Sequence, residues 1–118
     1  MELHASGEDY LAAILVLQAQ DGAVRSIDLA RFRGVSKPSV SRAVGVLSDG
    51  GFLTVDERGF LHLSEAGLRI AEKICGRRRF LASRFIELGI DPVRAEQDAC
   101  RIGHAVSDEV FEKLKDVL

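Results

Sequence analysis

The fold is decided by residues 36–47, which read Ser36-Lys37-Pro38-Ser39-Val40-Ser41-Arg42-Ala43-Val44-Gly45-Val46-Leu47. Val40, Val44 and Leu47 recur at helical spacing, so they predict one buried stripe. Ser36 precedes that stripe as an N-cap, and Pro38 falls in the first turn, where its missing N–H costs nothing. Hydroxyl and basic side chains occupy the other positions, and they suit close approach to phosphates and base edges. The segment therefore predicts a helix whose exposed face binds nucleic acid.

The segment before this helix predicts a second, shorter helix. Ser26 is expected as its N-cap, residues 27–32 form its body, and Gly34 begins a tight turn into Ser36. A helix, a glycine-containing turn and a second helix form the helix-turn-helix signature. Two core helices of a bundle would give a similar pattern. The serine-rich exposed face and the distribution of charge favour a DNA-binding interpretation.

A β-hairpin is expected directly after the second helix. Residues 52–55 and 60–63 read as strands, and residues 56–59 read as the turn between them. A hairpin in this place is a wing, and it has to pack on the helices to be stable. Arg58 at its tip could reach a phosphate or the minor groove, although a solvated turn charge fits the pattern equally well. Val24 and Arg25 are expected as a further short strand.

Four more helices are expected around these elements. The first begins near Ser6, with Asp9 completing a capping box, and continues to about residue 20. The others cover 64–88, with a bend or interruption near Gly76, then 91–106 and 110–118. The fold class is therefore mainly α with a small β-hairpin. It consists of a winged helix-turn-helix domain, 1–72, and a helical dimerisation domain, 73–118.

The charge distribution supports nucleic-acid binding better than the total charge does. The formal net charge is −2, but residues 24–46 carry five basic side chains and one acidic one. Residues 69–84 carry six basic side chains and one acidic one. The local field, rather than the total, governs attraction to phosphates.

Composition also limits the location and the assembly. No apolar run is long enough to span a bilayer, so no membrane association is expected. Cys75 and Cys100 are too few for a disulfide framework, which predicts a cytoplasmic protein with reduced thiols. The chain is too short to cover all of its apolar side chains near the C-terminus, so a homodimer is expected through the last three helices. Those side chains are Phe80, Phe85, Ile86, Val110, Phe111 and Leu114.

Three segments together resemble one known family. They are Ser-Gly-Glu-Asp-Tyr-Leu at 6–11, Val-Ser-Lys-Pro-Ser-Val-Ser at 35–41, and Asp-Ala-Cys-Arg-Ile-Gly-His-Ala-Val-Ser-Asp-Glu at 98–109. In this order they resemble the DtxR/MntR family of metal-dependent repressors. The resemblance implies a winged-helix domain and a dimerisation domain that binds Fe(II) or Mn(II), with metal loading that switches on operator binding. A short form without the SH3-like third domain is expected.

The metal ligands implied by the resemblance are present only in part. Asp9, Cys100 and His104 match ligand positions, whereas Gly103 stands where the family has a Glu and Arg78 where it has a His. A thiolate, an imidazole and one carboxylate suit Zn(II) better than Mn(II) or Fe(II), which prefer more oxygen and nitrogen donors. The cofactor expectation therefore stays open between Mn(II), Fe(II), Zn(II) and no metal.

Arg78 itself suggests a replacement for the metal. A guanidinium is permanently charged and can pair with a carboxylate through two hydrogen bonds, so we expect Arg78 to form a salt bridge with Asp9. Only one of the three consecutive arginines at 77–79 can point inward from a helix, and the resemblance selects Arg78. A solvated charge within this basic run is the competing interpretation.

The sequence thus predicts a homodimeric transcriptional repressor of double-stranded operator DNA, with a weakened or lost metal switch. Two alternatives remain: a thiol-redox regulator that uses Cys100 or Cys75, and a winged-helix module that binds protein. An enzyme is not expected, because no catalytic constellation is present. The expected DNA contacts are Arg25, Ser36, Lys37, Pro38, Ser39, Ser41, Arg42 and Arg58.

Overall fold

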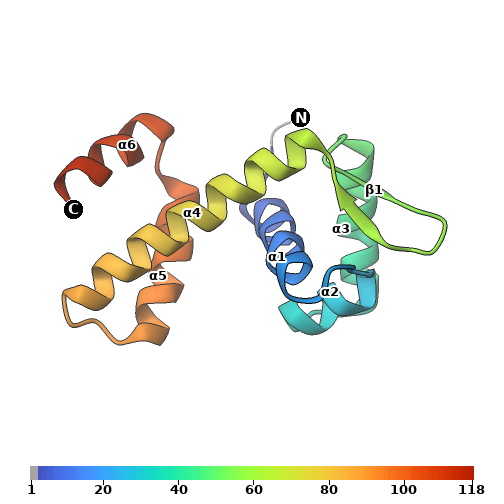
Figure 1. The fold of residues 1–118 in the computed structure, drawn as a ribbon, viewed down its shortest axis with the longest axis horizontal. Coiled ribbons are helices and arrows are strands. Elements are labelled where there is room, and N and C mark those ends of the chain that lie inside the picture. Colours follow the sequence, from blue (N-terminus) through green and yellow to red (C-terminus); the bar gives the residue numbers. More distant parts are fainter. Residues whose placement is uncertain (1–2) are drawn as a thin grey trace. The chain divides into compact units, whose positions relative to one another are not determined.

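The structure is a computed structural model that describes residues 3–118. The chain divides into two compact units, residues 1–72 and residues 73–118 (Figure 1). The elements in order are α1 (Ala5–Asp21), α2 (Ser26–Arg33), α3 (Lys37–Asp49), β1 (Leu53–Val55), β2 (Leu61–Leu63), α4 (Glu65–Glu87), α5 (Pro92–Ala105) and α6 (Asp108–Val117). The predicted fold class, mainly α with a small β-hairpin, is confirmed.

The N-terminal unit is built around the middle of α1. Leu11 and Ile14 of α1 are fully buried, and they share one apolar cluster with Leu29 of α2 and Val40 of α3. Leu61 of the hairpin joins the same cluster. Burial of such side chains is worth roughly 1.5–3 kcal/mol each, so this shared core fixes the helix-turn-helix against α1.

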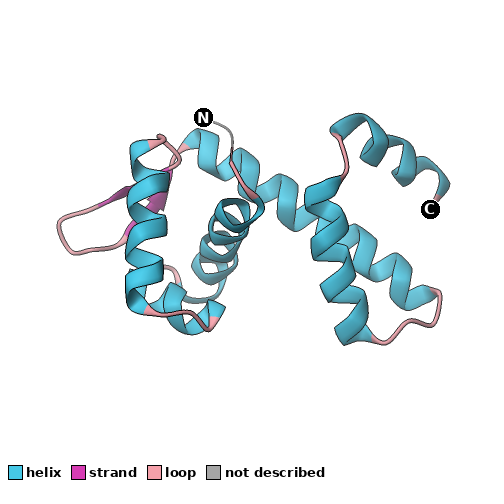
Figure 2. Cartoon of the chain, turned by 180° about the vertical axis from the view of Figure 1, so that it is seen from behind, coloured by secondary structure: helices cyan, strands magenta, loops and turns pink. Residues whose placement is uncertain are grey.

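The wing is a short antiparallel pair that extends from the helices of this unit (Figure 2). In its register Leu53 pairs with Leu63, and Leu61 pairs with Val55. Leu53 and Leu61 are buried while the residues between the paired ends face solvent, which is the alternation of a sheet with one packed face. The predicted strand at 24–25 is reduced to a bridge between Arg25 and the residue before β2.

The starts of the first two helices differ from the predictions. The N-cap of α1 is His4 and makes no side-chain capping bond, so the prediction of Ser6 as the cap is wrong. The N-cap of α2 is Arg25 rather than Ser26. Its backbone N–H donates to Asp28 Oδ2 at 2.9 Å, because an acidic side chain at the third helical position can reach back to the N-cap amide.

Helix α4 is continuous through Gly76, so the predicted bend or interruption there is wrong. A single glycine in a helix interior lowers stability by about 1 kcal/mol without breaking the hydrogen-bond ladder. Ser64 caps the helix as predicted, because its Oγ accepts the Gly67 N–H at 3.1 Å. The helix ends before Gly89, whose φ of 91° belongs to the left-handed region.

The C-terminal unit has its own small core. Leu81 of α4, Ala99 of α5 and Phe111 of α6 form its centre, and Phe80 packs edge-on against Phe111 with 5.7 Å between the ring centroids. Phe111 is only 7% exposed, so the prediction that it belongs to a surplus apolar surface is wrong. None of the helices between residues 3 and 118 is both long and apolar enough to cross a membrane.

Candidate nucleic-acid interface and candidate metal ligands

The entry of α3 is built as the sequence predicted. Gly34 has a φ of 67°, a left-handed conformation that glycine adopts without strain, and it turns the chain from α2 towards α3. Ser36 Oγ accepts the Ser39 N–H at 3.3 Å and donates to Ser39 Oγ at 2.8 Å. Pro38 has no N–H, and the Val40 N–H donates to the Ser36 carbonyl oxygen at 3.1 Å, so the Lys37 N–H is the first-turn amide that is left for a phosphate.

Helix α3 is divided cleanly into a buried and an exposed face. Val40, Val44 and Leu47 are 0%, 8% and 1% exposed, so the predicted stripe is the packed side. The predicted contact residues on this helix are all exposed: Ser36, Lys37, Pro38, Ser39, Ser41 and Arg42. Because the apolar stripe anchors the helix, these polar side chains are presented to solvent on a rigid element.

The two remaining predicted contacts lie at the base and the tip of the wing. The Arg25 guanidinium lies over the Phe60 ring, 4.4 Å from the ring centroid, and both residues form the bridge beside the hairpin. Arg58 is exposed in the turn between β1 and β2. All eight predicted contacts therefore belong to the N-terminal unit, on α3, on the wing or at the base of the wing.

The turn of the wing is organised by Asp56, which sequence reasoning missed. Its Oδ1 accepts the N–H groups of Arg58 at 2.9 Å and Phe60 at 3.0 Å, and its Oδ2 lies 2.8 Å from His62 Nε2. The hydrogen bond from His62, followed by the backbone amide of Phe60, lowers the pKa of Asp56 below its ordinary value of 3.8. An Asp that begins a turn ending in Gly59 is the signal that could have identified it.

Asp9, the first predicted metal ligand, lies on α1 next to an arginine of its own unit. Its Oδ2 is 3.8 Å from Arg33 Nη1, and the Arg33 guanidinium lies 5.1 Å from the centroid of the Tyr10 ring. Arg33 is the last residue of α2, so it stands just before the turn into α3. The arginine next to Asp9 within the N-terminal unit is thus Arg33, a contact that the sequence did not suggest.

The other two predicted ligands lie together on α5. Cys100 Sγ is 3.8 Å from His104 Nε2, because residues four apart lie on the same face of a helix, and both side chains are half-buried. Gly103 is buried and brings no donor atom to this face. An added Cβ at Gly103 would lie 3.6 Å from Arg77 Cβ, which is ordinary contact. The α5 face therefore offers one sulfur and one nitrogen.

Arg77 takes the inward position among the three consecutive arginines. Its Nη1 donates to the carbonyl oxygens of Gly103 at 2.9 Å and Val106 at 2.8 Å, and its Nη2 pairs with Asp108. Arg77 is 5% exposed, Arg78 is half-buried and Arg79 is exposed. Arg77, and not Arg78, is therefore the arginine of this run that points inward. The salt bridge between Arg78 and Asp9 stays a prediction.

Both units match models of known protein families. Residues 2–61 match the model of the iron-dependent repressor N-terminal DNA-binding domain. Residues 64–118 match the model of the iron-dependent repressor metal-binding and dimerisation domain. The chain belongs to the iron-dependent repressor family. The resemblance seen in the sequence is confirmed, and so is the order of a DNA-binding domain before a dimerisation domain.

This iron-dependent repressor family member is similar to known regulators over most of its length. It is 29% identical over 110 residues to a helix-turn-helix-type transcriptional regulator of Methanocaldococcus jannaschii, covering 92% of this chain and 88% of that protein. It is 29% identical over 105 residues to the transcriptional regulator MntR of Salmonella typhimurium, covering 89% and 67%. The structure of the manganese regulator SloR matches with a TM-score of 0.84 and 25% identity, covering 94% of this chain and 52% of that one. The chain thus spans about half the length of SloR.

Proposed function

We propose that this chain is a transcriptional repressor that binds double-stranded operator DNA as a homodimer. The proposal rests mainly on the exposed polar face of α3. This helix follows a turn at Gly34, which is left-handed, and precedes the wing. Membership of a family whose N-terminal model is a DNA-binding domain supports the proposal. The family consists of transcriptional regulators, so we do not expect enzymatic activity. The same proposal puts the protein in the cytoplasm, where its DNA is.

In the proposed complex α3 enters the major groove with its N-terminal end leading. Lys37 binds a phosphate through its ammonium group and its backbone N–H, and Ser39, Ser41 and Arg42 reach base edges. Arg58, at the tip of the wing, binds the neighbouring backbone or the minor groove. Phosphate contacts fix the register of the protein, while the hydroxyls and Arg42 carry the choice of sequence.

The metal switch is proposed to be weakened or lost. Residues 64–118 match a family model that is described as a metal-binding and dimerisation domain. A divalent metal is therefore the expected effector of the family. In this chain the donors on α5 are a thiol and an imidazole, and Gly103 adds none. That donor set does not fit Mn(II) or Fe(II), which prefer several oxygen and nitrogen ligands, but it is compatible with Zn(II). Asp9, Cys100 and His104 are the proposed ligands of any residual site.

The proposal is tested by selecting binding sites from a pool of random DNA duplexes. We expect enrichment of a two-fold symmetric site whose half-sites are about 34 Å apart, because two α3 helices of a dimer would read successive major grooves. A monomer by sedimentation in the presence of the selected DNA would contradict the dimer. Failure to enrich any sequence would refute the repressor, and would favour the protein-binding alternative.

Charge variants then locate the interface. If Arg42 contacts a phosphate, Arg42→Ala should weaken DNA binding and reduce the slope of log K against log salt by about one unit. If Arg42 contacts a base, the same substitution should relax the base preference at one position of the site. Lys113→Ala removes the same charge from an exposed position on α6 and serves as the control. Equal effects of the two substitutions would contradict the assignment. Alkylation of Cys75 and Cys100 without loss of DNA binding would count against the thiol-redox alternative.

A further inference from the structure

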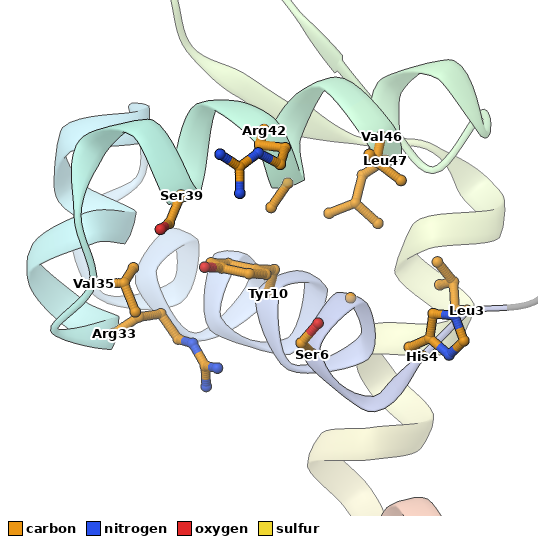
Figure 3. Close-up of a pocket in the computed structure, with 12 residues that line it drawn as sticks. Leu3, His4, Ser6, Tyr10, Arg33, Val35, Ser39, Arg42, Val46 and Leu47 are labelled. Atoms are coloured by element: carbon orange, nitrogen blue, oxygen red, sulfur yellow. The ribbon is translucent and has the colours of Figure 1, made fainter.

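A cavity of about 660 Å³ lies in the N-terminal unit between the start of α1 and the face of α3 (Figure 3). Tyr10, which is 7% exposed, lines the cavity with its ring, and Leu47, which is 1% exposed, lines its buried side. The volume is that of a site for a small organic molecule, which is ordinarily a few hundred to a thousand Å³. Nothing in the proposed DNA interface requires a cavity of this size at this position.

The two ends of this cavity differ in chemistry. At the end near Val35 lie the Ser39 hydroxyl and the Tyr10 hydroxyl, with Arg33 beside them, whereas Leu3 and Val46 lie at the opposite end (Figure 3). Ser39 Oγ already accepts a hydrogen bond from Ser36, so its own proton is available to a ligand. The cavity therefore has one end with hydroxyl and guanidinium groups and one mainly apolar end, where His4 beside Leu3 is the polar side chain.

The charge of the lining has one sign. Arg33 and Arg42 both line the cavity, and none of the aspartates or glutamates between residues 3 and 118 does. Arg33 Nε is buried without a hydrogen-bond partner in the part of the chain that the structure describes, and its nearest carboxylate, Asp9, is 3.8 Å from Nη1. A guanidinium near an apolar floor favours an anion that can accept two of its N–H groups.

We propose that this cavity binds an amphipathic monocarboxylate and that its occupant displaces DNA. The carboxylate pairs with Arg33, and the apolar body lies along Tyr10 towards Leu3 and Val46. The second half of the proposal rests on the proposed function, because Ser39 and Arg42 line the cavity and are also proposed DNA contacts. One side chain cannot serve both partners at once, so ligand and operator compete.

Binding is tested on the full chain with octanoate, kept below its micelle concentration, by titration of backbone amide resonances. Octanamide has the same apolar body without the charge, and acetate has the charge without the body. We expect saturable shifts at Ser6, Tyr10, Ser39 and Val46 with octanoate, with a dissociation constant on the order of 1 mM, and binding about fivefold or more weaker for the other two. Octanamide that binds as tightly as octanoate would overturn the proposal. Acetate that binds as tightly would also overturn it, because the site would then recognise a small anion, such as phosphate, without the apolar body.

Arg33→Gln should weaken octanoate binding about fivefold or more and leave octanamide unchanged. Arg31→Gln is the matched control, because Arg31 is an exposed arginine of the same helix that does not line the cavity. Val46→Asp, at a half-exposed position, is a second variant that introduces repulsion without disturbing the core. Unchanged octanoate affinity in folded Arg33→Gln and Val46→Asp would refute the site.

Competition is measured separately by DNA affinity in the presence of octanoate. At a concentration ten times its dissociation constant, an exclusive ligand raises the apparent dissociation constant of DNA about tenfold. If octanoate binds without changing DNA affinity, the proposed competition with DNA is refuted, whereas the proposed ligand site is not. A chain that binds octanoate but no DNA would instead refute the proposed function, so the two failures are distinguishable.

Discussion

Gly67 shows how one missing side chain joins the wing to α4. An added Cβ at this position would lie 1.9 Å from the carbonyl oxygen of Phe52, which is backbone and cannot move aside. The same carbonyl accepts the Ser64 N–H at 3.1 Å, so the strand and the helix start are held closely together. Only glycine permits this approach, because any Cβ would force the hairpin away from the helix.

Gly67→Ala should therefore destabilise the protein by about 3 kcal/mol or more, the upper range for an overpacked site. Gly76→Ala is the matched control on the same helix, since an added Cβ there meets nothing within 4 Å. It should stabilise the protein by about 0.5–1 kcal/mol through the higher helix propensity of alanine. Urea denaturation followed by circular dichroism measures both. Similar stabilities for the two variants would contradict the close approach.

Asp56 makes the wing sensitive to acid. Its hydrogen bonds with His62 and the backbone amides hold its pKa below the ordinary value of 3.8. A lowered pKa means that the ionised carboxylate stabilises the folded wing above about pH 4, and that this contribution is lost as the pH falls through the lower folded value. The wing should therefore stay ordered at neutral pH and loosen only in acid.

Hydrogen exchange of the Arg58 and Phe60 amides measures this effect. In the native chain their protection should fall below about pH 4, after correction for the intrinsic rate. Asp56→Ala should show the reduced protection already at pH 7, whereas Glu57→Ala, at an exposed position in the same turn, should not. Full protection in Asp56→Ala would mean that the turn does not depend on this carboxylate.

Arg77 stabilises the junction between the two helices α5 and α6. The last carbonyl groups of a helix have no partner within it, and Arg77 donates to two carbonyls at the end of α5 while it pairs with Asp108 at the start of α6. The guanidinium also lies 5.1 Å from the centroid of the Phe111 ring. One buried side chain of α4 thus fixes two other helices.

Arg77→Ala should lower the free energy of unfolding by about 2–4 kcal/mol, because a buried carbonyl at Gly103 and a partly buried one at Val106 lose their donor. Arg79→Ala removes the same charge from an exposed position and should change stability by about 0.5 kcal/mol or less. Urea denaturation, monitored by a probe in residues 73–118, compares them. If both variants unfold alike, the junction is held by the apolar core alone.

The sequence predicted the elements that depend on local signals and missed those that depend on tertiary partners. Periodicity and the Ser36 cap defined α3, and alternation with a turn defined the wing. The inward direction of Arg77 could not be read from three identical neighbours, since the choice depends on where α5 and α6 pack. The caps of α1 and α2 were misplaced because serine is a favourable cap only when the backbone enters the helix at that residue.

At the scale of the whole molecule, the resemblance identified the family, and Cys100 and His104 do lie together on α5. The cavity beside Tyr10 could not be predicted, because its lining comes from three separate segments of the chain. In the sequence, Arg33, which borders it, is only one of the five basic side chains of residues 24–46. Side chains that become neighbours through folding leave no local signal.

We expect DNA binding by this protein to be independent of metal. If Arg78 takes the place of the metal by pairing with Asp9, native DNA affinity should not change in excess chelator. Arg78→Ala should weaken DNA binding about tenfold, and Arg78→His should acquire a response to added Mn(II). Fluorescence anisotropy with the selected operator measures all three, with Arg79→Ala as control. Loss of native binding in chelator would show that a functional metal site exists and that Arg78 does not replace it.

The way Asp56 holds the wing has an evolutionary consequence. The carboxylate binds main-chain amides, so the turn keeps its shape with any residue at 57 and 58 that leaves the N–H of residue 58 in place, which excludes proline there. Mutations at these two positions are then free to accumulate without loss of folding, and natural selection can act on their effect at the operator alone. If the wing contacts DNA as proposed, descendants of this chain can acquire new target sites one substitution at a time at the wing, while α3 and its core stay unchanged.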